Sequence, residues 1–453
     1  MSGTNRDQVW LKLLPERFRT KIQGRFNLQK IITSAGWLFA DKISRMGVGL
    51  IVGAWVARYL GPAQFGVLNY ALAFVFLISP LASLGLDRIV IRNILRDPSR
   101  KEETLGTSFL LKLISGISTL FLSIIIIVIV RPEDRLVQVL VAITALSMVV
   151  QAFDVIDFWF QSKTQAQNVV YARNAAFLTI SLLKILLIVS SAPLVWFAWA
   201  FFAEIAIAAI GLMFYYRRDG QTLKAWRANC EQARSLLSDS WPLILSGLSI
   251  MIYMRIDQIM LGELSGNRAV GIYSAVTKIS EVWYFVPTVI VSSLFPTLIR
   301  IRTQDEQMYY RRLQKLFSLM TILAIGISIP VTFLSTKIMA MLFGDNFADG
   351  GGILAVHIWA SLFVFLSVVQ GQWDVSEDLT RLRFWRTSAG ALINIVLNFI
   401  LIPRYEAMGA AVATVISYAC SAYLLNTFHW KTRPIFIQQT RSLFFVDIFW
   451  SIR

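Results

Sequence analysis

The chain has 453 residues, of which 56% are hydrophobic and only 15% are charged, and its 43 Lys and Arg outnumber its 27 Asp and Glu. A mean hydropathy of +0.61 lies far outside the range of soluble domains, which excludes a soluble enzyme or binding module. The two cysteines, Cys230 and Cys420, are too few and too separated to build a disulfide framework, and we assign them no redox role. The composition therefore indicates a polytopic membrane protein.

Twelve apolar stretches fill the chain, and each is long enough, at about 20 residues, to cross about 30 Å of hydrocarbon as a helix. A closed barrel would show short alternating strands, whereas these stretches are continuously apolar. The sequence thus predicts an all-α polytopic membrane protein. We place its transmembrane helices near 31–58, 63–86, 105–130, 136–158, 169–190, 194–216, 241–262, 268–299, 313–342, 352–374, 382–402 and 407–429.

The orientation follows from the distribution of Lys and Arg. The N-terminal segment, the even-numbered loops and the tail together carry 31 of them, whereas the loops on the opposite side carry six. Cytoplasmic loops of membrane proteins are rich in Lys and Arg, so both termini are predicted to be cytoplasmic. The net charge of +16 is then a signal of topology, and it implies no nucleic-acid partner.

The chain divides into five predicted segments. The first is a basic amphipathic segment without the compact apolar core of a cleavable signal peptide, and we expect it to lie on the inner leaflet. A cytoplasmic linker separates an N-lobe of helices 1–6 from a C-lobe of helices 7–12, and a cytoplasmic tail follows. The segments are 1–30, 31–216, 217–240, 241–429 and 430–453.

A weak internal repeat supports the division into two lobes. Residues 61–67 (GPAQFGV) match residues 266–272 (GNRAVGI) at an offset of 205. With six helices in each half, the repeats would run parallel, related by an axis along the membrane normal. Two pseudo-symmetric six-helix lobes around a central cavity are therefore expected, with the binding site in that cavity.

Charged residues inside the helices do not follow this repeat. An ionised side chain near the bilayer centre costs about 3 kcal/mol on insertion scales. Charges that occur in one half but not at the equivalent position of the other therefore favour a functional role over a role in the shared scaffold. They lie in the predicted first, seventh and eighth helices, at Asp41, Lys42, Arg45, Arg255, Asp257, Lys278 and Glu281.

Helical spacing sorts these charges into pairs. Asp41 and Arg45 are four residues apart and can form an ion pair on one face, and Lys278 and Glu281, three apart, can do the same. Arg255 and Asp257 lie about 200° apart around the helix, so these two side chains cannot pair with each other. Each of them needs a partner on another helix, an ion or the transported molecule.

Other polar residues favour structural roles. Lys184 and Glu204 can meet across the short turn between the fifth and sixth helices. Asp154 and Asp157 are interpreted as interfacial residues at the end of the fourth helix. His357 and His429 are lone residues on apolar helices, where a core or interface role is the more common one. Phosphate-binding loops and metal-ligand spacings are missing, so we expect no enzyme activity, no cofactor and no metal.

Several segments carry a resemblance to a known family. The chain resembles the bacterial O-antigen-type, or Wzx-like, oligosaccharide flippases, in the polysaccharide-transporter branch of the multidrug/oligosaccharidyl-lipid/polysaccharide exporter superfamily. The resemblance covers about residues 31–430 and rests on residues 85–92 (GLDRIVIR), 255–262 (RIDQIMLG), 271–275 (GIYSA), 281–287 (EVWYFVP) and 409–414 (GAAVAT).

This resemblance implies a function. Members of the family move undecaprenyl-pyrophosphate-linked sugar repeat units from the cytoplasmic to the periplasmic leaflet of the bacterial cell inner membrane. Other proteins then act on the sugars, so a polysaccharide polymerase and a chain-length regulator are expected partners beside the lipid bilayer. The resemblance leaves open which sugars are carried, which ion drives transport and how many chains associate.

The residues fit that implication. A pyrophosphate carries about two negative charges and needs cationic donors. Inside the cavity these are expected to be Lys42, Arg45, Arg255 and Lys278, while Arg88 and Arg92 at the inner mouth would capture the headgroup first. The candidates for ion coupling are Asp41, Asp257 and Glu281.

Three alternatives differ in what they require. A small-molecule multidrug antiporter of the same superfamily predicts an acidic pocket, whereas the buried set here has a surplus of cations. A polysaccharide polymerase or glycosyltransferase predicts a large outer loop or a catalytic domain, which this sequence lacks. A flippase for another lipid-linked polymer, such as a capsule or teichoic acid unit, is not separable from the first reading by these residues.

Overall fold

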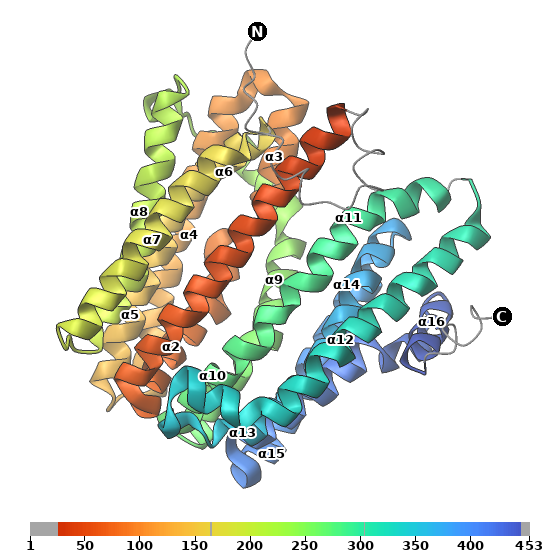
Figure 1. Cartoon of the computed structure of the whole chain (residues 1–453). Coiled ribbons are helices and arrows are strands. Elements are labelled where there is room, and N and C mark those ends of the chain that lie inside the picture. The colour runs from red at the N-terminus through yellow and green to blue at the C-terminus, as the bar shows by residue number, and fades with distance from the viewer. Residues whose placement is uncertain (1–25, 164, 303, 445–453) are drawn as a thin grey trace. The chain divides into compact units, whose positions relative to one another are not determined.

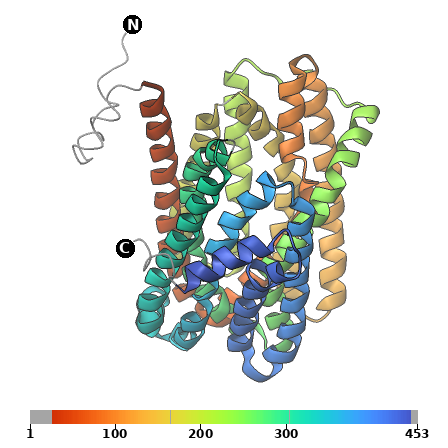
Figure 2. The ribbon, with the colours of Figure 1, turned by 90° about the vertical axis from the view of Figure 1, so that its right-hand side faces the viewer.

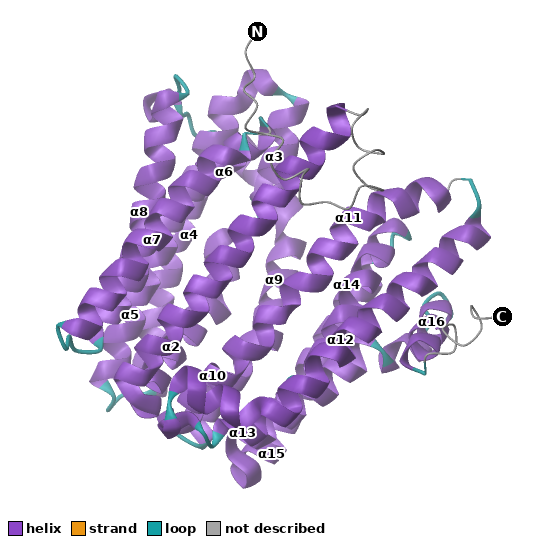
Figure 3. Cartoon of the chain, viewed as in Figure 1, coloured by secondary structure: helices purple, strands orange, loops and turns teal. Residues whose placement is uncertain are grey.

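The computed structural model describes residues 26–163, 165–302 and 304–444, and of residues 26–44, 166 and 296 only the backbone is described. Its contacts divide the chain into Met1–Leu50 and Ile51–Arg453, and each unit is considered by itself. Within the described residues, every regular element is a helix (Figure 3). The predicted amphipathic segment 1–30 lies almost wholly outside the described residues, as does the end of the predicted tail.

The first half of the described chain contains seven α-helices joined by short 3₁₀ turns. The α-helices are α2 (Phe26–Ser83), α3 (Asp87–Arg96), α4 (Lys101–Val130), α5 (Arg135–Val150), α6 (Val155–Ser162), α7 (Ala166–Val189) and α8 (Val195–Arg218). The 3₁₀ turns are η2 (Pro98–Arg100) and η3 (Gln151–Asp154).

The second half begins within the predicted linker 217–240, part of which is helical. Its α-helices are α9 (Cys230–Leu264), α10 (Asn267–Glu281), α11 (Phe285–Arg302), α12 (Glu306–Phe343), α13 (Gly350–His357), α14 (Ala360–Ser376), α15 (Thr380–Ala422) and α16 (Arg433–Leu443). The 3₁₀ turns are η4 (Leu223–Ala225), η5 (Val282–Tyr284), η6 (Asp345–Phe347) and η7 (Leu424–Thr427).

The described residues contain ten helical runs long and apolar enough to cross a membrane, and two of them are twice the usual length, at 52 and 48 residues. In the first of these, α2 is interrupted at Gly61, with φ of 68°. In the second, α15 is interrupted at Glu406, with φ of 47°. Because each break divides a long run in two, the structure agrees with the twelve helices predicted from the sequence.

The helices of Ile51–Arg453 pack in two groups. In the first, α4 lies against α5, α5 against α8, and α7 against α8 (Figure 1). In the second, α9 lies against α15, and α12 lies against α13 and α14. These groups are the two lobes expected from the sequence, although the position of the boundary at 217–240 stays a prediction. Buried Phe160 belongs to the core of the first group, and Phe317 and Phe365 belong to that of the second.

Two amphipathic helices occupy segments that the sequence left as loop and tail. α3 buries Ile89, Val90 and Ile94 and exposes its charges. α16 buries Ile435 and Gln439 and runs crosswise to the long helices (Figure 2, dark blue). Both were missed because a short charged segment has too few apolar residues to stand out beside membrane spans.

Candidate functional site

The two repeated glycine stretches pack directly against each other. A Cβ placed on Gly66 would lie 1.7 Å from the carbonyl oxygen of Asn267, and one on Gly271 would lie 1.9 Å from that of Pro62. Gly66 and Pro62 lie 205 residues before Gly271 and Asn267, so the repeat exchanges one contact for the other and the interface has its pseudo-symmetry. We call these four residues the outer contact. Because no side chain separates the backbones of α2 and α10 there, only glycine fits.

An arginine joins the lobes beside the outer contact. Arg131 Nε lies 2.8 Å from Glu263 Oε1, and its Nη2 donates to the carbonyl of Gly262 at 2.6 Å. The guanidinium lies 4.0 Å from the ring centroid of Tyr70, whose hydroxyl donates to Glu263 at 2.6 Å. A further Arg131 hydrogen bond reaches Asn267 at 3.1 Å. The first lobe is thus tied to the second at the end that bears the turns predicted to be outside.

Two cations of the second lobe face α2. Lys278 Nζ lies 4.4 Å from the ring centroid of Phe65 and 3.7 Å from the position of a Cβ on Gly53. The guanidinium of Arg255 lies 5.8 Å from the ring centroid of Phe76. Both cations therefore lie where the lobes meet.

The charge pairing differs from the expected one. Glu281 lies 3.8 Å from Arg255 on the neighbouring helix, whereas the sequence paired it with Lys278 on its own helix. The side chain of α10 at position 281 is therefore directed toward α9. Among the side chains that the structure describes, Lys278 forms no ion pair, and it lies against the Phe65 ring and Gly53.

A third cation comes from the first lobe. Lys184 Nζ lies 3.4 Å from Glu204 Oε2, which confirms the pair predicted across the hairpin of α7 and α8. Both side chains are about one quarter exposed, at 26% and 28%. The charges of Lys184 and Arg255 also lie close enough to act on Lys278 electrostatically. From the sequence we expected only a structural role for Lys184, and the signal for more was a charge midway along an apolar helix.

Asp257 lies in a closed polar cluster of the second lobe. It accepts hydrogen bonds at 2.7 Å from both the Tyr273 hydroxyl and Thr414 Oγ1, and another from the Asn398 amide. Asn398 in turn contacts Asn394 at 3.1 Å. The residue is only 4% exposed. Partners from α10 and α15 compensate its burial.

The remaining sequence candidates are dispersed. Arg88 and Arg92 lie exposed on α3, and Arg92 forms an ion pair with Asp239 of α9 at 2.5 Å. Asp41 and Lys42 lie in helical backbone whose side chains are outside the described set. Arg45 belongs to the unit Met1–Leu50, so its relation to the cations of the other unit stays a prediction.

A charge cluster inside the first lobe was missed. Arg173 lies 2.7 Å from Asp157 and 3.5 Å from Asp154, and Lys112, only 3% exposed, lies 4.0 Å from Asp154. Asp157 is only 5% exposed, whereas the Asp154 side chain is about one third exposed, and the interfacial position of the two aspartates stays a prediction. Lys112 within apolar α4 was the signal available in the sequence.

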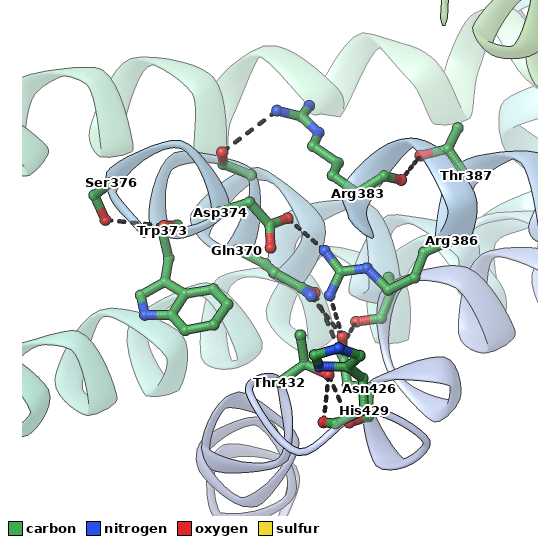
Figure 4. Close-up of polar contacts among 12 residues, drawn as sticks. Gln370, Trp373, Asp374, Ser376, Arg383, Arg386, Thr387, Asn426, His429 and Thr432 are labelled. Carbon is green, nitrogen blue, oxygen red and sulfur yellow. Dashed lines mark hydrogen bonds and ion pairs between the residues drawn. The ribbon is translucent and has the colours of Figure 1, made fainter. Parts of the chain in front are cut away.

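A second missed cluster lies inside the second lobe (Figure 4). Arg386 bridges Asp374 of α14 and Asn426 of η7, and Gln439 of α16 also contacts Asn426 at 3.0 Å. All four side chains are buried. This cluster attaches the amphipathic α16 to the membrane helices.

The two histidines have local partners. His357 is buried and lies 2.8 Å from Ser280 Oγ through its Nδ1, which confirms a satisfied core histidine. His429 accepts a hydrogen bond from the backbone of Lys431 at 3.2 Å.

Known structures show the same fold. The lipid II flippase MurJ, in an inward closed conformation, aligns with a TM-score of 0.74 and 14% identity over 91% of this chain and 92% of that chain. An inward-facing multidrug resistance MATE family transporter of the MOP superfamily aligns with a TM-score of 0.69 and 14% identity over 87% of this chain and 96% of that one. These alignments support a fold of twelve membrane helices in two lobes for this chain.

Curated relatives match over shorter stretches. The probable flippase AglR of Haloferax volcanii is 32% identical over 186 residues, which are 40% of this chain and 38% of AglR. The capsular polysaccharide biosynthesis protein CapF of Staphylococcus aureus is 21% identical over 177 residues, 39% of this chain and 45% of CapF. The chain thus spans about two fifths of the length of these relatives.

A family model for polysaccharide biosynthesis proteins matches residues 31–302, which include all of the first lobe together with α9, α10 and α11. The match contains Lys184, Arg255 and Lys278. With more than half of its residues covered by that model, the chain belongs to the polysaccharide biosynthesis protein family.

Proposed function

We propose that the protein is a flippase that moves a lipid-linked oligosaccharide with a pyrophosphate headgroup from the cytoplasmic to the opposite leaflet. The observation that carries the proposal is that Arg255 and Lys278 of the second lobe face α2, near enough to Lys184 of the first lobe for its charge to act on Lys278. Membership of the polysaccharide biosynthesis family and the names of relatives such as AglR, a probable flippase, support the choice of substrate class.

The charge balance of these residues favours an anionic passenger. Glu204 and Glu281 are each paired with a cation, and Lys278 adds a positive charge without a carboxylate partner among the described side chains. An unpaired charge away from water is costly in free energy. A pyrophosphate that takes the place of the missing carboxylate would offset much of that cost. The guanidinium of Arg255 can bind two phosphate oxygens at once. A multidrug antiporter for cations would require the opposite balance.

The closed outer contact supports an alternating-access cycle. With α2 and α10 packed backbone to backbone and Arg131 joining the lobes, the end predicted to face away from the cytoplasm is shut. The headgroup would enter from the cytoplasmic side, past Arg88 and Arg92, and leave when the lobes rock apart at the outer contact. The lipid tail would stay in the bilayer throughout.

Asp257 is our candidate for the coupling-ion site. It is two residues from Arg255 on α9, and its charge acts on Glu281, the ion-pair partner of Arg255. Binding of a proton or sodium ion at Asp257 would weaken its repulsion of Glu281 and so alter the hold of Glu281 on Arg255. We expect Asp257→Asn to transport without dependence on an imposed ion gradient, as measured in vesicles, with Asp349→Asn as an exposed control. A gradient dependence equal to that of the unmodified protein would exclude Asp257.

The finer assignments remain part of the proposal. We propose an undecaprenyl carrier, a bacterial cell inner membrane with both termini cytoplasmic, and neighbours that polymerise the glycan and regulate its chain length. The excess of Lys and Arg on one side of the membrane supports the orientation. O-antigen, capsule and other glycans share the same headgroup chemistry, so the residues that bind the headgroup do not select among them.

The test is a translocation assay with the purified full chain in vesicles. A fluorescent lipid with a pyrophosphate-linked oligosaccharide is placed in both leaflets, and a membrane-impermeant quencher reports the fraction that remains protected. Lys278→Gln is the decisive variant, and Arg268→Gln on the same helix, whose ion pair with Asp349 is largely exposed, is its matched control. We expect at least about a tenfold slower exchange for Lys278→Gln, because a charge-assisted phosphate contact is worth about 1.5–3 kcal/mol.

The control variant should exchange the lipid at the original rate. Equal rates for Lys278→Gln and the unmodified protein would remove the cation cluster from the mechanism. No exchange by the unmodified protein, in vesicles where it is shown to be folded and inserted, would reject the flippase assignment itself.

A further inference from the structure

A second arginine of the first lobe reaches the second lobe at the outer end. Arg58 of α2 donates through Nη2 to the carbonyl of Met341 and, at 3.5 Å, to that of Ala340. Its aliphatic part lies beside Gly344, where a Cβ would lie 3.6 Å from Arg58 Cγ. These three partners belong to the last turn and the C-cap of α12. Arg58 thus joins the lobes at a different helix from Arg131, which binds α9.

The end of a helix is a favourable partner for a cation. The last four carbonyls of an α-helix have no partner within the helix, and together they carry about half a negative charge. Arg58 brings a guanidinium to the last turn of α12, and Arg131 brings one to the last turn of α9. The carbonyls that they bind, those of Met341 and Gly262, each lie two residues before the last residue of their helix. The two arginines therefore make the same kind of contact.

The internal repeat relates these two contacts. Arg58 and Glu263 each lie three residues before a glycine of positive φ that begins a repeated stretch. Arg131 and Gly344 are the C-cap residues of α4 and α12, which are the third predicted membrane helices of their lobes. The repeat therefore exchanges the pair Arg131–Glu263 for the pair Gly344–Arg58. Because a glycine occupies the C-cap in the second pair, Arg58 reaches the helix carbonyls and not a side chain.

The contact of Arg58 can break at low cost. Its side chain is exposed, at the end of the molecule that is predicted to lie outside, so water can replace the carbonyls of Ala340 and Met341. An exposed contact of this kind contributes little free energy by itself. It nevertheless adds to the contact of Arg131, because the two arginines hold different helices of the second lobe.

We infer that Arg58 is a second arginine that holds the outer end shut, and that it acts independently of Arg131. In the shut state, the first lobe binds the C-terminal ends of α9 and α12 through one arginine each. Both contacts must break before the lobes separate at this end. The inference rests on the alternating-access cycle proposed above, and it does not depend on the chemistry of the passenger.

Distance measurements between spin labels on the full chain in lipid nanodiscs test this inference. One label is placed at Ser190→Cys in the first lobe and one at Tyr405→Cys in the second. Both residues are exposed and lie in turns predicted to be outside. The background carries Cys230→Ser and Cys420→Ser, and no passenger is added.

Four variants are compared with the unmodified protein in this background. Arg58→Gln removes the cation, Arg58→Lys keeps the charge without the fork of donors, and Arg131→Gln is combined with Arg58→Gln and also measured alone. Arg268→Gln is the matched control, because this arginine is exposed at the same end but its ion pair with Asp349, at 3.2 Å, stays within the second lobe.

We expect the ratio of the long-distance to the short-distance population to rise about threefold in Arg58→Gln, because an exposed charged contact is lost from the shut state alone. Arg58→Lys should lie between Arg58→Gln and the unmodified protein. In the double variant, the fold-changes of the two single variants should multiply, since the contacts lie on separate helices. The control should leave the ratio unaltered.

Two results would overturn the inference. One is the same ratio in Arg58→Gln as in the unmodified protein. The other is a double variant no more open than Arg131→Gln alone, which would show that Arg58 does not act independently. Because the measurement contains no lipid-linked sugar, a failure of the flippase assay would reject the proposed passenger and leave the role of Arg58 to be decided by these distances.

Discussion

At the scale of single residues, burial of charge separates function from structure. Two buried charges have partners, Arg386 with Asp374 and Asp157 with Arg173, and partly buried Lys184 is paired with Glu204. Lys278 has no such partner among the described side chains. A buried ion pair can belong to the fold alone, whereas a charge that is removed from water and has no partner points to a ligand.

The buried pair of Asp374 and Arg386 gives a prediction about stability. Asp374→Ala leaves the guanidinium, 7% exposed, without its carboxylate, which is expected to cost about 3–5 kcal/mol. Thermal unfolding of the detergent-solubilised protein should show a large fall in Tm. The matching change at an exposed pair, Asp349→Ala, should stay within about 0.5 kcal/mol. The double variant Asp374→Leu, Arg386→Met should recover most of the loss, and a loss as large as that of the single variant would contradict this account.

At the scale of elements, the outer contact shows how the repeat is used. Gly66 and Gly271 occupy equivalent places in α2 and α10, and each meets the backbone of the other helix. The preceding glycines, Gly61 and Gly266, both have φ near +70° to +90°, a conformation that lets the chain turn sharply into the packed helix. A duplicated hinge and contact make the two lobes meet in a pseudo-symmetric way.

Gly271→Ala should open this contact. The added Cβ would lie 1.9 Å from the Pro62 carbonyl, so the helices must separate. Spin labels at Glu133 and Asp345, in a background with Cys230→Ser and Cys420→Ser, would report the distance between the lobes. We expect a population at longer distance, and reduced exchange in the vesicle assay. Gly326→Ala, where no atom lies within 4 Å of the new Cβ, should leave the distance distribution unchanged. An unaltered distance distribution in Gly271→Ala would contradict the claim that the glycine contact between α2 and α10 holds the lobes together.

The spans could be predicted because each one is a long apolar run, and the breaks at Gly61 and Glu406 fall in the gaps between predicted helices. α3 and α16 could not be predicted, since their helical period is hidden among charged residues.

The site was predicted in part. Arg255 and Lys278 are conspicuous in sequence, but the partner of Glu281 depends on how α9 and α10 pack, which one sequence does not specify.

At the scale of the whole molecule, the cations between the lobes and the tie at Arg131 belong to one cycle. In the state described, α2 meets α10 at the outer contact, and Arg131 links the first lobe to Glu263 and Gly262 of the second. Because these bonds cross between the lobes, we expect them to break when the outer end opens. An interaction present in one state and absent in the other sets the ratio of the two states.

Arg131→Gln should therefore shift the molecule toward the outward-open state. The variant loses the ion pair with Glu263 and the cation–π contact with Tyr70, interactions worth together about 1–3 kcal/mol in favour of the shut state, or a change of about fivefold or more in the ratio. In the background lacking both native cysteines, a cysteine at Phe76, beside Arg255, reports access from outside through labelling by a membrane-impermeant maleimide.

Labelling of Phe76→Cys should be slow with Arg131 present and several-fold faster in Arg131→Gln. Arg135→Gln is the matched control, because Arg135 is a neighbouring exposed cation with no ion pair to the described residues of the other lobe. The same labelling rate in both variants would show that the outer contact of glycines holds the lobes without Arg131. Faster labelling in Arg131→Gln alone would establish that the arginine sets the balance between the two states, since the glycines are unaltered in that variant.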